Sequence, residues 1–265
     1  MNSTATIADA SLLRRDVDGV AWLTLNRPQA RNALSMGLMT ALDDALVAIG
    51  RDASVKVVVI GGAGPAFCAG HDLREMRAHP EEASAAATFA LCSRVMQRVV
   101  GLAKPVIARV HGVATAAGCQ LVASCDLAVA ADTARFATPG VNIGLFCSTP
   151  MVALSRAVGR KQAMEMLLTG EMVAADRARE IGLVNRVVPE AELDTAVAAL
   201  AGGIAAKSPL TVAIGKEAFY RQAELPMADA YAYAAAVMTR NMMAHDAAEG
   251  IDAFLAKRHP VWTGT

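Results

Sequence analysis

Short runs of β-branched and small apolar residues, separated by helix-like stretches, constrain the fold of this chain more than any other feature. The clearest run is Val-Val-Val-Ile at residues 57–60, and a continuous run of this kind is typical of a strand buried on both faces. Similar runs occupy residues 106–110 and 127–130. A helical pattern fills residues 35–49, before the first run, and another fills residues 83–102, between the first run and the second. Strands that alternate with helices indicate right-handed crossover units and an α/β fold.

Local signals mark where several of these elements begin and end. Residues 20–25 predict a strand, which Asn26-Arg27-Pro28 ends, and Ser35 is expected to cap the helix at residues 35–49. Beyond residue 160 the chain is expected to be almost wholly helical. The expected helices cover residues 161–168, 174–180, 190–206, 210–221, 227–243 and 247–256. Strands in the first half and helices in the second predict one domain with a helical C-terminal appendage.

Composition narrows the classes of function. Apolar residues make up 54% of the 265 residues and aromatic residues only 4%, so the core is expected to consist of Ala, Val, Leu and Met, with subunit interfaces to bury. The 25 basic and 25 acidic residues balance, which argues against a nucleic-acid partner. Charged and polar residues interrupt the longest apolar stretch, residues 106–131, so no membrane span is expected.

The cysteines and the N-terminus bear on the compartment. Five cysteines, an odd number without Cys-x-x-Cys spacing, favour free thiols in a reducing compartment and no zinc or other metal site. Residues 1–11 lack the apolar core of a signal peptide and are expected to form a frayed terminus. These features predict a cytoplasmic protein.

Two loops rich in small residues are the strongest functional signal. The first, Cys68-Ala69-Gly70-His71-Asp72-Leu73, comes after the strand at residues 57–60, and the second, Ala116-Ala117-Gly118-Cys119-Gln120, comes after the strand at residues 106–110. The pair resembles the oxyanion hole of the crotonase (enoyl-CoA hydratase/isomerase) superfamily. That resemblance implies that the backbone N–H groups of His71 and Ala117 hold the thioester oxygen of an acyl-CoA. Alanines at 116 and 117, where glycines are usual, keep these donors and narrow the pocket.

Further segments extend the resemblance over nearly the whole chain. They are Asn26-Arg27-Pro28 with Arg31-Asn32-Ala33-Leu34, Ser124-Cys125-Asp126, and residues 170–183. Membership implies a crotonase-like ββα spiral core over residues 12–200 and a C-terminal helical trimerisation region over residues 201–265. It also implies a homotrimer or hexamer, a coenzyme A thioester as substrate, and no permanently bound cofactor. Within the superfamily, the loops resemble the branch of mitochondrial enoyl-CoA hydratase domain-containing proteins of the third type.

The resemblance also assigns substrate-binding positions. Beside the catalytic positions they are Arg27, Ala33, Cys68, Ala69, Asp72, Leu73, Arg74 and Lys257. Arg27, Arg74 and Lys257 are candidates for the CoA phosphates, although exposed cations also serve as ordinary solvated charges. Asp72 is expected to cap the helix that follows it. His71 can lend only its backbone or also bring its imidazole to the substrate.

The two acids expected in a hydratase are absent from this chain. The superfamily's glutamates correspond to Gln120, after the second loop, and Gly140, after Pro139. An amide cannot act as an acid or base near neutral pH, and glycine has no side chain, so ordinary hydration lacks its proton-transfer groups at these positions. Gly140 is equally well explained as a turn glycine.

Three functions therefore stay open. The first is an acyl-CoA enzyme of hydratase/isomerase descent that stabilises a thioester enolate. The second is a decarboxylase of malonyl-type thioesters, which needs the oxyanion hole but no protein base. The third is a non-catalytic acyl-CoA binding protein. The two loops motivate the first, and the missing glutamates, which weigh against ordinary hydration, motivate the second and third.

Overall fold

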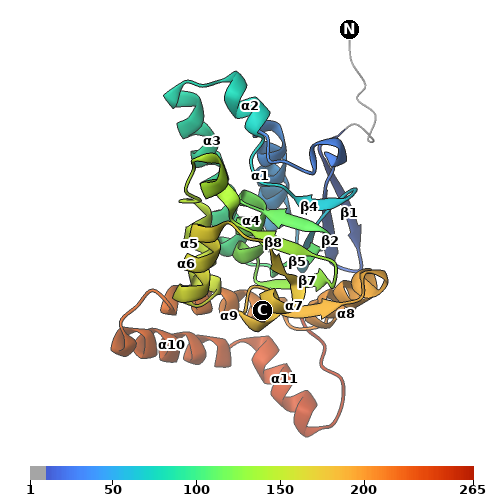
Figure 1. Cartoon of the computed structure of the whole chain (residues 1–265). Coiled ribbons are helices and arrows are strands. Elements are labelled where there is room, and N and C mark those ends of the chain that lie inside the picture. Colours follow the sequence, from blue (N-terminus) through green and yellow to red (C-terminus); the bar gives the residue numbers. More distant parts are fainter. Residues whose placement is uncertain (1–9) are drawn as a thin grey trace.

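The computed structural model describes residues 10–265 (Figure 1). Most of the frayed terminus expected at residues 1–11 lies outside the described residues. Residues 12–17 form an edge strand, which the sequence did not predict. This strand pairs along its whole length with the next one, from Leu12 opposite Leu25 to Val17 opposite Val20.

A six-stranded sheet forms the centre of the fold. In spatial order its strands are β1 (Leu12–Val17), β2 (Val20–Leu25), β3 (Val57–Gly62), β5 (Val106–Val110), β7 (Leu127–Ala131) and β10 (Arg186–Val188). Neighbours run parallel except for the antiparallel pair β1 and β2. The four strands predicted at residues 20–25, 57–60, 106–110 and 127–130 are confirmed, and β3 continues two residues beyond its predicted end.

A second sheet carries the two loops of interest. Its strands, in spatial order, are β4 (Ala66–Cys68), β6 (Val113–Thr115), β8 (Arg135–Ala137) and β9 (Val173–Ala174). The first three are parallel and β9 is antiparallel to β8. Each strand has three residues or fewer, which is too short for a sequence period to be recognised.

The larger sheet is buried on both faces, as the β-branched runs predicted. Val57 and Val59 pack with Ile107 against Leu193 and Val197, both on α8. The alternate residues of β3 belong to the main core on the other face, together with the buried sides of α1, α3 and α4. Because side chains of a strand alternate between faces, a run of consecutive β-branched residues fills both layers at once.

Helices surround the two sheets. The helices before residue 160 are α1 (Met36–Arg51), α2 (Leu73–Ala78), α3 (Glu82–Gly101), α4 (Ala117–Ser124) and α5 (Pro150–Ala157). The later helices are α6 (Arg160–Thr169), α7 (Ala175–Glu180), α8 (Leu193–Ala205), α9 (Pro209–Gln222), α10 (Met227–Met242) and α11 (His245–Leu255). The Oγ of Ser35 accepts the N–H of Leu38 at 3.2 Å, so the predicted N-cap of α1 is confirmed.

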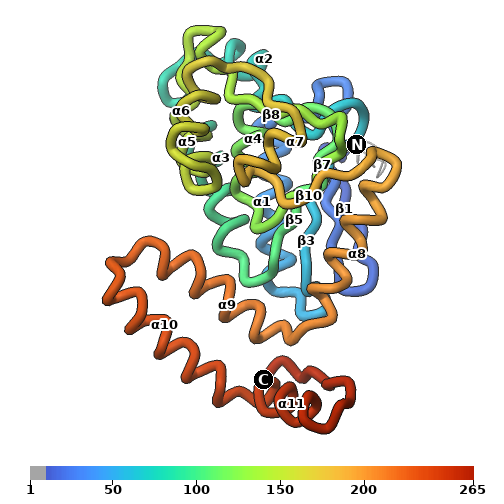
Figure 2. The backbone as a smooth tube through the Cα atoms, turned by 60° about the horizontal axis from the view of Figure 1, so that its bottom comes forward, coloured from blue at the N-terminus to red at the C-terminus, as the bar shows by residue number. Residues whose placement is uncertain are grey.

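The last three helices extend away from the sheets (Figure 2). Their large apolar side chains are exposed, with Met243 80% and Phe254 82% accessible. Lys216 on α9 anchors this arm to the body: its Nζ lies 2.7 Å from Asp126 Oδ2 and also bonds the carbonyls of Val99 and Lys104. The division at residues 200 and 201 stays a prediction, and α8 runs across it.

Within residues 10–265, no single helix has the length and apolar character needed to cross a membrane. By length and composition alone, one bent pair, Glu190–Ala205 with Pro209–Gln222, meets that test.

Candidate active site

The two small-residue loops meet at one edge of the smaller sheet. The first loop leaves β4 at Cys68 and the second leaves β6 at Thr115, and these strands are parallel neighbours. Gly70 makes the contact between them. Its φ is +101°, and a Cβ placed there would lie 2.9 Å from the Cβ of Ala116 and 3.2 Å from the Thr115 carbonyl oxygen. Only glycine combines this backbone conformation with so close an approach.

Ala116 holds the second loop in an unusual conformation. It has φ 50° and ψ −118° and stands directly before α4, whose first residue is Ala117. Its N–H donates to the Ala137 carbonyl at 2.9 Å, which ties the loop to β8. A non-glycine residue with positive φ costs about 1–3 kcal/mol, and such strain collects where function fixes the backbone.

Two backbone N–H groups at this meeting point are unpaired. Within residues 10–265, neither the N–H of His71 nor that of Ala117 donates to any acceptor. Ala117 is fully buried, and as the first residue of α4 it lies at the positive end of that helix dipole. Buried N–H groups nearly always have partners, so the unpaired N–H of Ala117, like that of the half-buried His71, is available as a donor.

An apolar cavity of about 570 Å³ opens beside these donors. Its wall contains His71, Ala117 and Gly140, so three of the four predicted catalytic positions come together. The remaining lining residues are Ala69, Leu73, Met76, Phe89, Ala116, Pro139, Asn142, Ile143, Leu145, Phe146, Cys147, Ser148, Thr149 and Pro150. The wall contains no Asp, Glu, Lys or Arg. This is the volume and lining expected of a small-molecule site.

The His71 side chain also reaches this cavity. Both of its ring nitrogens are buried without a hydrogen-bond partner, and its ring meets that of Phe89 edge to face with centroids 5.5 Å apart. Burial lowers the pKa of His71, and the nearby Leu34 carbonyl opposes this shift in part. The imidazole is therefore neutral at pH 7.

Gln120, the fourth predicted catalytic position, does not line the cavity. Its side chain is buried against α3, where its Oε1 lies 3.8 Å from the Sγ of Cys92. Ala117 therefore lines the cavity, whereas the Gln120 side chain, one turn further along α4, packs against α3 in the core.

Gly140 has no room for a side chain in this structure. A Cβ there would lie 2.4 Å from the Leu145 carbonyl oxygen and 2.9 Å from the Sγ of Cys147. The segment from Pro139 to Ile143 forms a 3-10 helix, and the Leu145 N–H closes back on the Gly140 carbonyl at 2.9 Å. The position where a glutamate is expected is thus occupied by the returning chain.

Arg27 and Asp72 fasten the first loop. Arg27 donates to Asp72 Oδ2 at 2.9 Å and to the Ala33 carbonyl at 2.6 Å. Asp72 Oδ1 accepts the N–H groups of Arg74 and Glu75, which confirms it as the N-cap of α2. Burial opposes ionisation of Asp72, but the bonds from Arg27 and the helix N–H groups prevail and hold its pKa below the usual range.

The other predicted substrate-binding positions fall into three groups. Ala69 and Leu73 line the cavity, and Ala33 and Cys68 are buried beside it, where burial raises the pKa of the Cys68 thiol to about 12. Arg74 is exposed on α2. Lys257 follows α11, at the end of the molecule opposite α2 (Figure 1), so one chain does not bring it to the cavity.

Several cavity residues carry no signal in the sequence. Phe89 comes from α3, and Leu145 and Phe146 come from the segment before α5. They are ordinary apolar residues, far from the loops along the chain. Only the folded structure identifies them as part of the wall.

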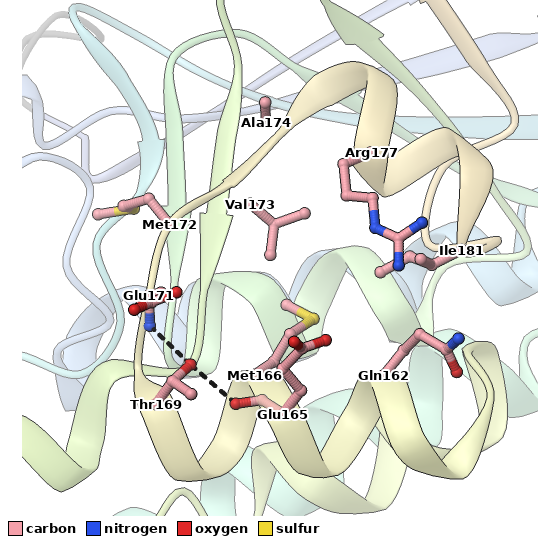
Figure 3. A pocket seen from close by; sticks show the side chains of 10 residues that line it. All are labelled: Gln162, Glu165, Met166, Thr169, Glu171, Met172, Val173, Ala174, Arg177 and Ile181. Atoms are coloured by element: carbon pink, nitrogen blue, oxygen red, sulfur yellow. Dashed lines mark hydrogen bonds between the residues drawn. The ribbon is translucent and has the colours of Figure 1, made fainter.

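A second hollow, of about 320 Å³, lies between α6 and α7 (Figure 3). Its polar groups already bond one another: the hydroxyl of Thr169 accepts the Glu171 N–H and donates to the Glu165 carbonyl. Arg177 pairs with Glu180 at 3.0 Å. Within residues 10–265 no group of three or more His, Cys, Asp or Glu side chains is placed to hold a metal ion.

Comparison with known proteins identifies the family. The model of the enoyl-CoA hydratase/isomerase family matches residues 15–265, and the chain belongs to this family. It is 47% identical over 249 residues to the human enoyl-CoA hydratase domain-containing protein 3, mitochondrial, covering 94% of this chain and 82% of that protein. The crystal structure of that human protein superposes with a TM-score of 0.93, 46% identity, and 95% and 100% coverage of the two chains. The crystal structure of an enoyl-CoA hydratase from Mycobacterium smegmatis superposes with a TM-score of 0.93 and is 56% identical in sequence. The match covers 95% of this chain and 98% of that one.

These findings confirm the crotonase fold and the resemblance to the third type of domain-containing protein. They contradict the expected cytoplasmic location, because the human, rat, mouse and Xenopus laevis relatives are all named mitochondrial. Those names point to the mitochondrion. The absence of an apolar signal core in the first residues was therefore a poor guide to the compartment.

Proposed function

We propose that this chain binds an acyl-CoA thioester and polarises its carbonyl group with the backbone N–H groups of His71 and Ala117. The observation that carries the proposal is the pair of unpaired N–H groups at the wall of an apolar cavity. Two preorganised donors stabilise the negative charge that an enolate places on the thioester oxygen, and losing one typically costs about 2.7–4 kcal/mol. The apolar wall accommodates the acyl chain.

Hydration by two carboxylates is not the reaction that this site favours. Gln120 is directed into the core, and a side chain at Gly140 would collide with the chain at Leu145. A general acid or base contributes about 10²–10⁴-fold, and neither position supplies one. The reaction class we favour is enolate formation at the carbon next to the thioester carbonyl.

Decarboxylation of a malonyl-type thioester is a second candidate, favoured by the absence of charged side chains from the cavity wall. The bond between the α carbon and the carboxylate breaks, CO₂ leaves, and the electron pair forms the enolate. An apolar wall removes water from the carboxylate and thereby favours its loss as neutral CO₂. A non-catalytic acyl-CoA binding role uses the same donors without any of these steps.

We also propose a homotrimer or hexamer built through α9 to α11. The exposed apolar side chains of this arm, such as Phe219, Tyr231 and Phe254, support it, because a monomer seldom exposes so much apolar surface. In such an assembly Lys257 of one chain is available to the CoA phosphates at a neighbour's site. Arg74, exposed beside the first loop, is the candidate phosphate partner within the same chain.

The test uses butyryl-CoA with ¹³C at the carbonyl carbon. Binding to the protein is expected to move the infrared carbonyl band to lower wavenumber, because two hydrogen bonds weaken the C=O bond. Ala117→Pro removes one donor at the first position of α4 and also moves Ala116 out of its positive φ, because the residue before proline prefers an extended backbone. We expect this variant to lose much of the band shift.

Arg160→Pro is the matched control, since it places proline at the first position of α6, away from the cavity. It is expected to keep the full shift. Failure of the natural protein to bind butyryl-CoA, or an equal shift in Ala117→Pro, would contradict the proposal. Turnover of crotonyl-CoA and malonyl-CoA, followed by mass spectrometry, then separates the two enzymatic candidates from the binding role.

A further inference from the structure

The imidazole of His71 makes no hydrogen bond of normal geometry within residues 10–265, although the Leu34 carbonyl lies close enough to raise its pKa in part. The proposed function uses only the backbone N–H of this residue, yet its ring also lies at the wall of the same cavity. Both ring nitrogens are buried without a hydrogen bond within residues 10–265. Buried polar side chains of native proteins almost always have partners, and each exception calls for an explanation.

His71 is also the only residue of the cavity wall that can take up a proton near neutral pH. The other polar side chains there are Asn142, Ser148 and Thr149, which do not titrate, and the Cys147 thiol, whose pKa is raised by burial. A neutral imidazole has one nitrogen that donates and one that accepts a proton. Proton transfer inside this cavity therefore has one candidate group.

The covalent structure keeps that group close to the reacting atoms. The oxygen of the bound thioester accepts the His71 N–H, and the ring is joined to the same residue through Cα and Cβ, with the N–Cα bond about 1.46 Å long. The edge-to-face contact with Phe89 at 5.5 Å orients the ring. A thioester oxygen bound at the His71 N–H would therefore place the α carbon, one atom beyond the carbonyl carbon, in the cavity that the imidazole lines.

We propose that the His71 imidazole is the catalytic base and acid of this site, exchanging a proton with the α carbon of a bound acyl-CoA thioester. The inference rests on the proposed function, because the enolate needs the two backbone donors. The C–H bond breaks, the proton moves to a ring nitrogen, and the electron pair forms the enolate double bond with the negative charge on the thioester oxygen. The imidazolium then returns the proton to carbon. The substrates are acyl-CoA thioesters that carry a hydrogen on the α carbon.

Ionisation of the ring agrees with the role of a base. Burial lowers its pKa, the Leu34 carbonyl raises it in part, and no charged group contributes to the shift. The ionisable side chains of α2 and its N-cap are Asp72, Arg74, Glu75 and Arg77, and those of α3 are Glu82, Cys92, Arg94 and Arg98. Cys68 lies before the loop and Cys147 across the cavity. Asp72 is paired with Arg27, and Glu75 accepts the Met36 N–H. The ring is consequently unprotonated and ready to accept a proton at pH 7.

The experiment follows deuterium entering the α position of butyryl-CoA in D₂O by mass spectrometry. His71→Gln keeps the backbone N–H and a polar side chain but cannot take up a proton. We expect it to exchange about 10²–10⁴-fold more slowly than the natural protein, the usual contribution of a general base. Its dissociation constant for butyryl-CoA, measured by calorimetry, is expected to stay within about threefold of that of the natural protein.

His111→Gln is the matched control. His111 is likewise buried with a pKa lowered mainly by burial, but it lies outside the cavity and bonds the Gly64 carbonyl at 2.8 Å. It is expected to exchange at the natural rate. The natural protein should also show an exchange rate that is level above the ordinary histidine pKa and falls only at lower pH, because burial lowers the pKa of His71 and the base form is already complete there.

The outcomes separate the two proposals. If the natural protein does not bind butyryl-CoA, the proposed function fails and this inference fails with it. If it binds and shifts the carbonyl band but exchanges no deuterium, or if His71→Gln exchanges equally fast, only the role of the imidazole is overturned. Should His71→Gln not fold, the pH profile of the natural protein decides, and a rate that rises with hydroxide without levelling off overturns the inference.

Discussion

Replacing Gly118 by alanine tests whether the contact between the two loops creates the donor pair. Gly118 follows Ala117 in α4, and a Cβ at this position would lie 2.1 Å from the carbonyl oxygen of Cys68 and 2.8 Å from the Cβ of Cys68. Cys68 ends the strand that leads into the first loop. In the proposed site, the close approach of α4 to this strand fixes where the two loops, and with them the His71 and Ala117 N–H groups, lie relative to each other.

The size of the effect follows from this geometry. An ordinary carbon–oxygen contact is about 3.3 Å, so the loops must separate by about 1.2 Å. A donor at about 2.9 Å from the thioester oxygen would then lie at about 4.1 Å, beyond any hydrogen bond. The polarisation from one donor is lost, and overpacking costs a further 1–3 kcal/mol or so of stability. At about 2–4 °C per kcal/mol, Tm is expected to fall by several degrees.

The assay combines the infrared shift of bound ¹³C-butyryl-CoA with thermal unfolding. Gly202→Ala in α8 is the control, because a Cβ there meets nothing within 4 Å, and alanine in a helix interior is expected to stabilise by about 0.5–1 kcal/mol. If Gly118→Ala kept both the full band shift and the natural Tm, the reasoning that glycine at this position holds the donors together would be refuted.

Two further predictions concern stability. Lys216→Met removes a cation that is 7% exposed and leaves Asp126 without its ion pair, so we expect a loss of about 3 kcal/mol in urea unfolding, whereas the exposed Lys207→Met should change little. Asp72→Asn keeps a capping side chain but loses the pair with Arg27. The pKa of Asp72 is lower in the folded protein than in the unfolded chain. The ionised carboxylate therefore contributes about 1–2 kcal/mol to the free energy of unfolding above roughly pH 4, and this contribution is lost as the pH falls through the folded pKa. The stability difference between the natural protein and Asp72→Asn should therefore shrink below pH 4, and a difference that stays constant from pH 7 to the acid range would contradict this reading of the pair.

The elements that the sequence predicts are those whose signals are local. The β-branched run of β3 must be buried on both faces wherever it lies, and Ser35 and Asp72 cap the helices that follow them. Edge strand β1 was missed because Arg14, Arg15 and Asp16 are polar, and an edge strand exposed to water needs no apolar period. Strands β4, β6, β8 and β9 are held by neighbours rather than by their own two or three residues.

The features of the candidate site likewise divide into those that local sequence predicts and those that depend on packing. The loops could be recognised because their residues resemble a family motif, and the structure shows why Gly70 and Gly118 belong to it: each allows a close approach of two backbones. The direction of Gln120 depends on how α4 packs on α3, and the crowding at Gly140 depends on where the chain returns at Leu145. Neither fact is encoded at the residue concerned. That the His71 ring lacks a hydrogen-bond partner is a property of the folded structure, and the sequence does not show it.

Because its thioester-polarising donors are amide groups of the main chain, the proposed site is insulated from two kinds of change. Amide N–H groups do not titrate between acid and alkaline pH, so their ability to hold an oxyanion persists wherever the chain stays folded. Side-chain replacements at positions 71 and 117 can alter the chemistry that follows without removing the donors, provided that the backbone does not move. A protein that binds the thioester through main-chain donors can change its reaction over evolutionary time and still bind the thioester.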